Sequence, residues 1–300
     1  MRLGTRGSAL ALAQSGLVAA ALTKRTGQPV ELVEIVTAGD RSSAPVQRLG
    51  VGVFVSALRD ALLAKEIDVA VHSYKDLPTA PADGLAVVAV PPREDPRDVL
   101  VARDGLTLTE LPAGARIGTG AVRRIAQLHA LGRGLVPVPI RGNVDTRLRK
   151  VFEGELDAVV LALAGLARLG RAAEAHEILD PELMLPAPAQ GALAVECRVD
   201  DPELRAALST VDDPETRALV DAERTLLATL EAGCSAPVAG LAEAAGDGQI
   251  HLRGAVLSPD GQLALRLART GTLADAATLG RLLAQDLLDA GADKVLGVQP

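Results

Sequence analysis

IDVAVHSYKDLP, at residues 67–78, combines a short apolar strand with a polar turn, and this stretch decides the fold prediction. The strand covers Ile67–His72, and Pro78 closes the turn that follows it. A helix is predicted just before it at Val55–Leu63, and a second short strand just after it at Leu85–Val90. Strands that alternate with helices are typical of a mostly parallel α/β sheet.

The alternation extends in both directions from this stretch. Apolar residues at helical spacing predict a helix between Ser8, a candidate N-cap, and Gly27, a candidate stop, followed by a strand at Val30–Thr37. A second alternation follows the proline-rich residues 91–96. It comprises strands at Val99–Ala102, Leu135–Ile140 and Ala158–Leu163 and helices at Val122–Leu131 and Thr146–Glu153. Two α/β units in tandem are the simplest interpretation.

The last third of the chain has a different pattern. A strand is predicted at Ala192–Glu196 and a helix over Pro214–Glu231. Two further strands, His251–Leu257 and Leu263–Ala268, precede a last helix at Ala274–Ala290. This order predicts an α+β tail that forms a separate small domain.

Composition argues against several classes of protein. The 300 residues carry a net charge of −7 and include one Tyr, two Phe and no Trp, so nucleic-acid binding is disfavoured. Cys197 and Cys234 form no CxxC motif and the four histidines form no HExxH motif, which argues against a zinc site or a disulfide framework and fits a reducing, cytosolic setting. We interpret the start of the chain as mature sequence, and no stretch reaches the roughly 18 apolar residues of a membrane span.

Positive charge is concentrated in one segment of this acidic chain. Residues 111–150 carry a single acidic residue, Asp145. The basic residues of the same segment are Arg116, Arg123, Arg124, Arg133, Arg141, Arg147, Arg149 and Lys150. A local patch of this kind indicates a small or medium polyanion as ligand. A solvated helix face in an arginine-rich protein is the alternative.

The position of the arginines favours a ligand site. Arg123 and Arg124 follow a Gly-Thr-Gly turn near a predicted helix start, and Arg141 follows a predicted strand. Arg6, beside Ser8, occupies the equivalent place in the first unit. Ligands of open α/β sheets bind beyond the carboxyl ends of the strands, where helix N-termini favour anions.

Four strings of polar residues carry a family resemblance. They are Val71–Pro78, Arg141–Leu148, Leu185–Ala192 and Leu230–Pro237. In this order and spacing they resemble the porphobilinogen deaminase (hydroxymethylbilane synthase) family over essentially the whole chain. The resemblance implies a transferase that deaminates porphobilinogen and joins four molecules head-to-tail into the linear tetrapyrrole hydroxymethylbilane. It also implies a cytoplasmic monomer that needs neither nucleic acid nor membrane as a partner.

The resemblance also implies a fold and a domain division. Two periplasmic-binding-protein-like (type II), doubly wound α/β domains are expected, with a small C-terminal α+β domain. The expected boundaries are 1–91 with 190–210 for the first domain, 92–189 for the second and 211–300 for the third.

Specific residues match the family's site positions. Cys234 would carry a dipyrromethane cofactor through a thioether, because a thiolate is a strong nucleophile. Asp76 would be the catalytic carboxylate. The other expected cofactor-binding residues are Arg123, Arg124, Arg147, Lys75, Ser8 and Thr119; the expected substrate-binding residues are Arg6, Arg141, Arg168, Gln190 and Phe54. No metal is implied, and Cys197 is interpreted as structural.

The sequence departs from the family pattern in three places. Residues 48–54 are one residue shorter than usual and lack a second basic residue, which affects the expected cover loop. Gly120 and Ala121 stand where many members have two serines, and Tyr74 stands where Met or Leu is usual.

Two alternative functions remain open from the residues alone. One is a non-catalytic two-lobed protein that binds a small polycarboxylate, which would need neither the thiol of Cys234 nor the carboxylate of Asp76. The other is a thiol hydrolase, which would need a histidine paired with the cysteine.

Overall fold

The computed structural model describes residues 1–36, 53–231 and 236–296, with side chains from residue 55 in the middle range. The chain divides into two compact units. The first unit contains Met1–Glu94 and Ala192–Arg217, and the second contains Asp95–Gly191 and Ala218–Pro300. The chain therefore passes between units three times. The C-terminal region belongs to the second unit, and its separation as a third domain at residue 211 stays a prediction.

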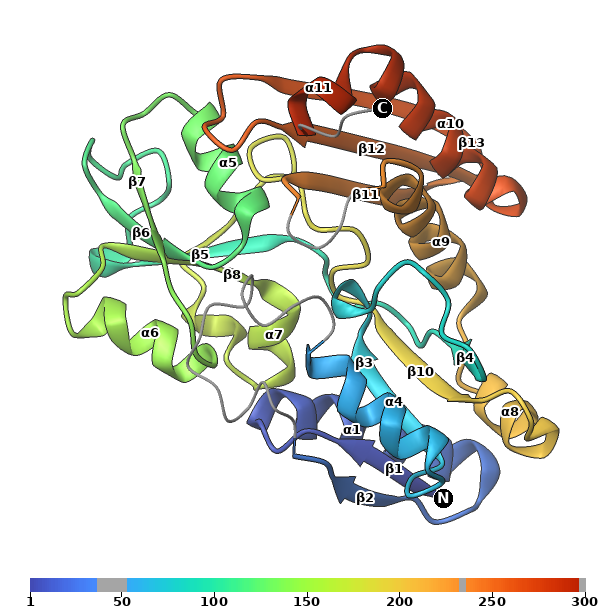
Figure 1. Ribbon diagram of the computed structural model, residues 1–300. Helices are drawn as coiled ribbons and strands as arrows, with labels where there is room; N and C mark the ends of the chain where they lie inside the picture. Colours follow the sequence, from blue (N-terminus) through green and yellow to red (C-terminus); the bar gives the residue numbers. More distant parts are fainter. Residues whose placement is uncertain (37–52, 232–235, 297–300) are drawn as a thin grey trace. The chain divides into compact units, whose positions relative to one another are not determined.

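A five-stranded mixed sheet forms the centre of the first unit (Figure 1). Its order is β2-β1-β3-β10-β4, with β1 at Arg2–Thr5, β2 at Glu31–Glu34, β3 at Val69–Ser73, β4 at Leu85–Ala89 and β10 at Leu193–Arg198. β1 pairs parallel with β2 and β3, whereas β10 pairs antiparallel with β3 and β4. The prediction of a mostly parallel sheet is confirmed, with β10 as the strand that runs against the others.

Helices cover both faces of this sheet. Val69 and Val71 of β3 pack in one core with α1 (Ala9–Thr26) and α8 (Pro202–Ser209). Ala70, between them, faces the opposite core with α4 (Val53–Leu63). Alternate side chains of a strand point to opposite faces, so a continuous apolar run serves two helix layers.

The first helix begins and ends where its sequence predicts. The Ser8 hydroxyl accepts a hydrogen bond from the Ala11 N–H at 3.3 Å and caps the N-terminus of α1. Gly27 ends the helix at φ 71°, a left-handed conformation that glycine adopts without steric cost.

The second unit contains a sheet with the same pattern of strand directions. The order is β7-β6-β8-β5-β9, with β5 at Asp98–Ala102, β6 at Arg116–Thr119, β7 at Val136–Pro139, β8 at Ala158–Ala162 and β9 at Glu177–Ile178. β5 is antiparallel to β8 and β9, and β6 is parallel to β7 and β8. In both units, therefore, the antiparallel strand is the first one formed after the chain enters from the other unit.

This second sheet is also covered on both faces. Leu100 and Ala102 pack with α5 (Val122–Ala130), while Val99 and Val101 pack with α6 (Val144–Phe152) and α7 (Leu163–Arg168). Short 3₁₀ turns occur at η2 (Arg103–Gly105), η3 (Ala172–Glu174) and η4 (Leu273–Asp275).

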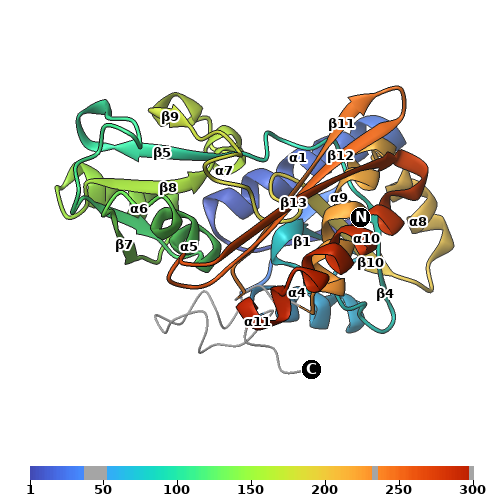
Figure 2. The ribbon, with the colours of Figure 1, turned by 90° about the horizontal axis from the view of Figure 1, so that it is seen from above.

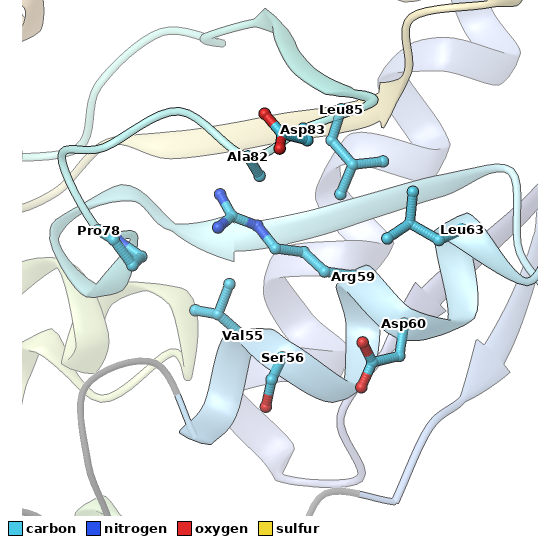
Figure 3. A pocket seen from close by; sticks show the side chains of 9 residues that line it. All are labelled: Val55, Ser56, Arg59, Asp60, Leu63, Pro78, Ala82, Asp83 and Leu85. Carbon is cyan, nitrogen blue, oxygen red and sulfur yellow. The ribbon is translucent and has the colours of Figure 1, made fainter.

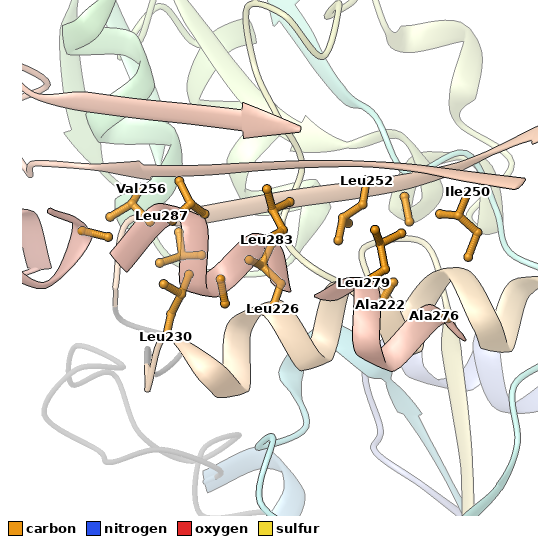
Figure 4. Close-up of a cluster of buried hydrophobic side chains, with 14 residues drawn as sticks. Ala222, Leu226, Leu230, Ile250, Leu252, Val256, Ala276, Leu279, Leu283 and Leu287 are labelled. Atoms are coloured by element: carbon orange, nitrogen blue, oxygen red, sulfur yellow. The ribbon is translucent and has the colours of Figure 1, made fainter. Parts of the chain in front are cut away.

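The rest of the second unit is a three-stranded antiparallel sheet with helices (Figure 2). The strands are β11 (Val238–Gly246), β12 (Gln249–Leu257) and β13 (Ala264–Thr272); the helices are α9 (Pro214–Thr229), α10 (Ala276–Asp289) and α11 (Ala292–Leu296). Leu226, Leu252 and Leu283 meet in the core between sheet and helices (Figure 4). A Cβ atom at Gly280 would lie 2.2 Å from the Ala222 carbonyl oxygen, so this glycine lets α10 approach α9.

The fold-class prediction is confirmed: two doubly wound α/β sheets precede a small α+β region. The interpretation of residues 118–120 as a turn was partly wrong, because Gly118 and Thr119 belong to β6. A Cβ atom at Gly118 would lie within 3 Å of side-chain atoms of Leu156, Ile140 and Val159, so close packing explains a glycine inside this strand.

Candidate active site

The turn that carries Asp76 lies at the carboxyl end of β3 as η1 (Tyr74–Asp76). Tyr74 and Leu77 are buried on either side of it, and the Tyr74 N–H donates to the Ala192 carbonyl at 3.0 Å. The Leu77 N–H closes the turn on the Tyr74 carbonyl at 3.2 Å. Lys75 and Asp76 are therefore held away from the core by buried residues on both sides, and the Asp76 side chain is exposed.

The Asp76 carboxylate makes no hydrogen bond or ion pair with the residues that the structure describes. Arg6 and Ser8 follow β1, the parallel neighbour of β3, so their positions lie at the same edge of the sheet. The Ser8 oxygen accepts the capping bond, which leaves its hydroxyl proton available to an acceptor. The structure thus brings Arg6, Ser8, Lys75 and Asp76 to one edge. The Phe54 side chain lies outside the described part.

In the second unit, a buried carboxylate organises two of the predicted arginines. Asp98 is fully buried, and its Oδ2 accepts from Arg123 Nη1 at 2.8 Å. Its Oδ1 accepts from Arg124 Nη2 at 2.7 Å and from Gln190 Nε2 at 2.7 Å. Burial alone would raise the pKa of Asp98, but the two guanidinium groups outweigh it and hold that pKa far below its usual range.

Both arginines also donate to the backbone. Arg123 Nη1 donates to the Leu185 carbonyl at 2.6 Å, and Arg124 Nη1 donates to the Val160 carbonyl at 2.9 Å. Two cations thus share one carboxylate, and one positive charge remains in the cluster. The buried Nε of Arg124 has no hydrogen-bond partner among the described residues. An N–H group in this state fits an anionic group that is brought into the cluster.

The loop after β7 holds the next two predicted arginines. Arg147 Nε donates to the Gly142 carbonyl at 2.9 Å, and Asn143 caps α6 by accepting from the Thr146 N–H at 2.9 Å. Arg141 Nη1 is buried and has no hydrogen-bond partner in the described chain. This Nη1 group therefore fits a carboxylate that the described residues do not supply.

Thr119, the last residue of β6, and Gly120, which follows it, lie at the neighbouring strand end. Thr119 is buried, and its hydroxyl accepts from the Ala121 N–H at 3.3 Å. A Cβ atom at Gly120 would lie 2.8 Å from the Ile140 carbonyl oxygen. This close approach leaves little room for a side chain at residue 120.

Arg168, at the end of α7, donates through Nη2 to the Gly191 carbonyl at 2.5 Å. Because β6, β7 and β8 are parallel, the residues that follow them share one edge of the sheet. Asp98 begins the antiparallel β5 opposite Ala162, so it lies at that same edge. The structure brings Thr119, Arg123, Arg124, Arg141, Arg147, Arg168 and Gln190 to this edge.

The two cysteines differ. Cys234 lies outside the described residues. Cys197 is buried in β10, where burial raises the pKa of its thiol to about 11 and keeps it protonated at neutral pH. Asp98 was missed in the sequence, although it stands at the start of an otherwise apolar strand.

The described residues offer few other kinds of site. Among the described residues, no group of His, Cys, Asp and Glu side chains could hold a metal ion. In the same residues, no helix is long and apolar enough to cross a bilayer. An open pocket of about 380 Å³ lies between α4 and residues 78–85, and none of the predicted site residues lines it (Figure 3).

Comparisons with known proteins give the same family for both parts of the chain. Residues 1–206 match the family model described as porphobilinogen deaminase, dipyromethane cofactor binding domain, and residues 218–289 match the model for its C-terminal domain. The chain belongs to the porphobilinogen deaminase family. The porphobilinogen deaminase of Nocardia farcinica is 59% identical over 304 residues, which cover 99% of this chain and 88% of the relative. Porphobilinogen deaminase 1 of Streptomyces coelicolor is 57% identical over 310 residues, which cover 99% of this chain and 97% of the relative.

Solved structures are matched at a lower level. The methionine-binding protein MetQ aligns with 70% of this chain and 89% of its own at 13% identity and a TM-score of 0.46. A periplasmic substrate-binding protein from Coxiella burnetii aligns with 73% and 94% at 14% identity and the same TM-score. At this level the alignment says nothing about ligand or activity.

Membership of the porphobilinogen deaminase family confirms the predicted activity and cofactor. The protein is a transferase that releases ammonia from porphobilinogen and builds the linear tetrapyrrole, and its cofactor is dipyrromethane. The binding-protein alternative is not favoured. The roles of individual residues do not follow from membership and are proposed below.

Proposed function

We propose that Asp76 is the catalytic carboxylate of this porphobilinogen deaminase. One observation carries the proposal: a turn held by the buried residues Tyr74 and Leu77 presents an exposed carboxylate that no described residue pairs with. A carboxylate used in a salt bridge within the protein, such as Asp98, has no free oxygen for a substrate.

The chemistry needs a free carboxylate of this kind. When the aminomethyl group of porphobilinogen loses ammonia, the C–N bond breaks and positive charge spreads to the pyrrole nitrogen. An Asp76 oxygen that accepts a hydrogen bond from the pyrrole N–H stabilises this charge as it develops. When the new C–C bond forms, the attacked pyrrole carbon loses a proton, and the same carboxylate can accept it.

The second unit supplies groups that fit the acetate and propionate side chains. Arg141 and Arg124 have buried N–H groups that no described residue accepts from, so they are the cations best suited to bind further carboxylates. Arg147 and Arg168 lie at the same edge. In the first unit, the residues that we propose to bind cofactor or substrate are Arg6, Ser8, Lys75 and Phe54. Thr119, Arg123 and Gln190 are buried, so we propose that they shape the cofactor site together with Asp98.

The proposed anchor of the cofactor is Cys234, which forms a thioether to dipyrromethane. When bound, this group supplies the terminal pyrrole to which substrate is joined. The residues of the protein that act on it are the arginines, which bind its carboxylates, and Asp76, which holds or moves a proton.

A boundary near residue 211, a monomeric state and a cytoplasmic location belong to the same proposal. The match to the first family model ends at residue 206 and the match to the second begins at residue 218, which supports the boundary. Size-exclusion chromatography with light scattering tests the monomer.

Intact-protein mass spectrometry under denaturing conditions tests the anchor. The wild type, after exposure to porphobilinogen, is expected to carry the extra mass of two linked pyrroles. Cys234→Ser is expected to lack this mass, and Cys197→Ser, the matched control, to retain it. Extra mass on Cys234→Ser, or none on the wild type, would contradict the proposal.

A further inference from the structure

A buried ion-pair network includes a residue of β3, the strand that leads into the Asp76 turn. Glu196 of β10 accepts hydrogen bonds from Arg59 of α4, with Nη2 2.8 Å from Oε1 and Nε 3.1 Å from both carboxylate oxygens. His72 of β3 lies on its other side, with Nε2 3.0 Å from Glu196 Oε2. One carboxylate thus joins two strands and a helix.

This network is deeply buried. The side chains of His72 and Glu196 are 3% and 2% exposed, and that of Arg59 is 18% exposed. Burial alone would raise the pKa of Glu196, but the hydrogen bonds from His72 and Arg59 outweigh it and lower that pKa below its usual range. Glu196 is therefore an anion at neutral pH. Since apolar residues often stabilise a fold as well as a buried ion pair does, stability alone is a weak reason for this arrangement.

The three members of the network connect the elements that carry site residues. His72 lies in β3 just before the η1 turn with Asp76, and Arg59 belongs to the helix whose first turn contains Phe54. The β10–β4 register shifts between Val195 and Glu196, and such an irregularity re-aims the side chains beside it.

The opposite side of the strand end is held separately. The Ser73 hydroxyl and the Gln14 amide of α1 lie within hydrogen-bond distance, with Gln14 Nε2 donating at 3.0 Å. The last two residues of β3 are therefore tied in opposite directions, to α4 through Glu196 and to α1 through Gln14.

We infer that Glu196 is a positioning residue for catalysis: through His72 and Arg59 it fixes the orientation of the Asp76 turn relative to α4. The inference rests on the proposed catalytic role of Asp76. It assigns to Glu196 no contact with substrate or cofactor.

Glu196→Gln is the primary test because it keeps the shape and removes the charge. We expect kcat to fall about tenfold to a hundredfold, since small displacements of a catalytic group have effects of this size, while KM changes much less. Asp68→Asn is the matched control: it breaks the Arg2–Asp68 pair in the same unit, next to the amino end of β3. Asp68→Asn is expected to lower the melting temperature without a change in kcat.

Arg59 offers a second test that does not depend on the folding of the Glu196 variant. The Arg59 side chain extends into the pocket between α4 and residues 78–85, where Figure 3 shows it between Val55 and Ala82. Arg59→Ala should lose kcat as Glu196→Gln does, and millimolar guanidinium, which can enter this pocket, should restore part of it. Arg59→Lys should retain more activity than Arg59→Ala.

The outcomes separate this inference from the proposed function. Full kcat in Glu196→Gln and Arg59→Ala, with an inactive Asp76→Asn, would overturn the positioning role alone. A fully active Asp76→Asn would overturn both. A loss of kcat in Asp68→Asn equal to that in Glu196→Gln would reduce the network to a purely structural role and would also overturn the inference.

Discussion

The two α/β sheets carry an aspartate at corresponding edges, and the two aspartates are in opposite states. Asp76 of the first unit is exposed and unpaired within the described residues. Asp98 of the second unit is fully buried between two arginines and a glutamine. The same side chain at the same kind of sheet edge is thus an exposed carboxylate, the one we propose for catalysis, in one unit and an internal counter-ion in the other. Burial and partners decide the role.

The largest expected effect is on turnover by Asp76→Asn. We expect kcat to fall by roughly 10²–10⁴-fold, because the amide can neither stabilise a cation nor accept a proton. The melting temperature should stay unchanged, since no described residue pairs with this carboxylate. Ammonia release and a thermal melt measure both quantities. A fold-preserving variant with wild-type turnover would remove the contrast with Asp98.

Asp98→Asn should have the reverse profile, with its main effect on stability. Removing one partner of a buried pair costs about 3–5 kcal/mol, because Arg123 and Arg124 would be left without their counter-ion. Urea unfolding measures the loss. Glu155→Gln, which removes a surface pair with Lys150, is the control and should change the unfolding free energy by about 1 kcal/mol or less.

Acid titration sharpens the same comparison. The pKa of Asp98 is lower in the folded state than in the unfolded state, where it is about 4. The ionised carboxylate therefore stabilises the fold at pH values above about 4, and this stabilisation is lost as the pH falls below about 4. The wild type should therefore lose stability on acidification more steeply than Asp98→Asn. If the unfolding free energies of wild type and Asp98→Asn fell equally steeply with pH, the carboxylate of Asp98 would not be held as an anion by the arginines.

Arg141→Leu should affect elongation more than stability. Loss of one charge-assisted bond to a substrate carboxylate is expected to reduce kcat/KM about 10- to 100-fold. Chromatography of the enzyme-bound intermediates should show stalled chains or a missing cofactor. An unchanged product distribution would exclude Arg141 from carboxylate binding.

The smallest effect is expected at Ser8. Ser8→Ala should destabilise the protein by about 1 kcal/mol through loss of the cap on α1. Ser8→Asn keeps a capping side chain, so it should restore stability. If the hydroxyl also contacts the cofactor, Ser8→Asn will still have reduced activity; full activity would leave Ser8 as a cap alone.

Local sequence patterns predict the strands and helix ends whose structure is set by residues close to them in the chain. The apolar runs of β3, β5 and β8 and the cap at Ser8 are predicted, because each follows from local residue types. β11 is missed because it is rich in alanine and glycine, which have low strand propensity. The antiparallel direction of β5 and β10 depends on pairing between distant segments, which no local pattern records.

The same distinction holds for the site. Asp76 stands in a distinctive string at a strand end, so its place is predicted. Asp98 and Glu196 are found only in the structure, because their partners Arg124 and Arg59 come from other segments of the chain. A carboxylate at the start of, or within, an apolar strand is the available signal, and it does not identify the cation that neutralises it.

The position of β10 has a consequence for biosynthesis. β10 lies between β3 and β4, yet it is encoded after almost the whole α/β part of the second unit. In a nascent chain that ends before residue 193, one edge of β3, the strand that leads into the Asp76 turn, and both edges of β4 therefore lack the strand pairing of the finished sheet. Translation has to pass residue 198 before the amino-terminal sheet can close, so we expect ribosome-bound chains shorter than this to need protection from aggregation.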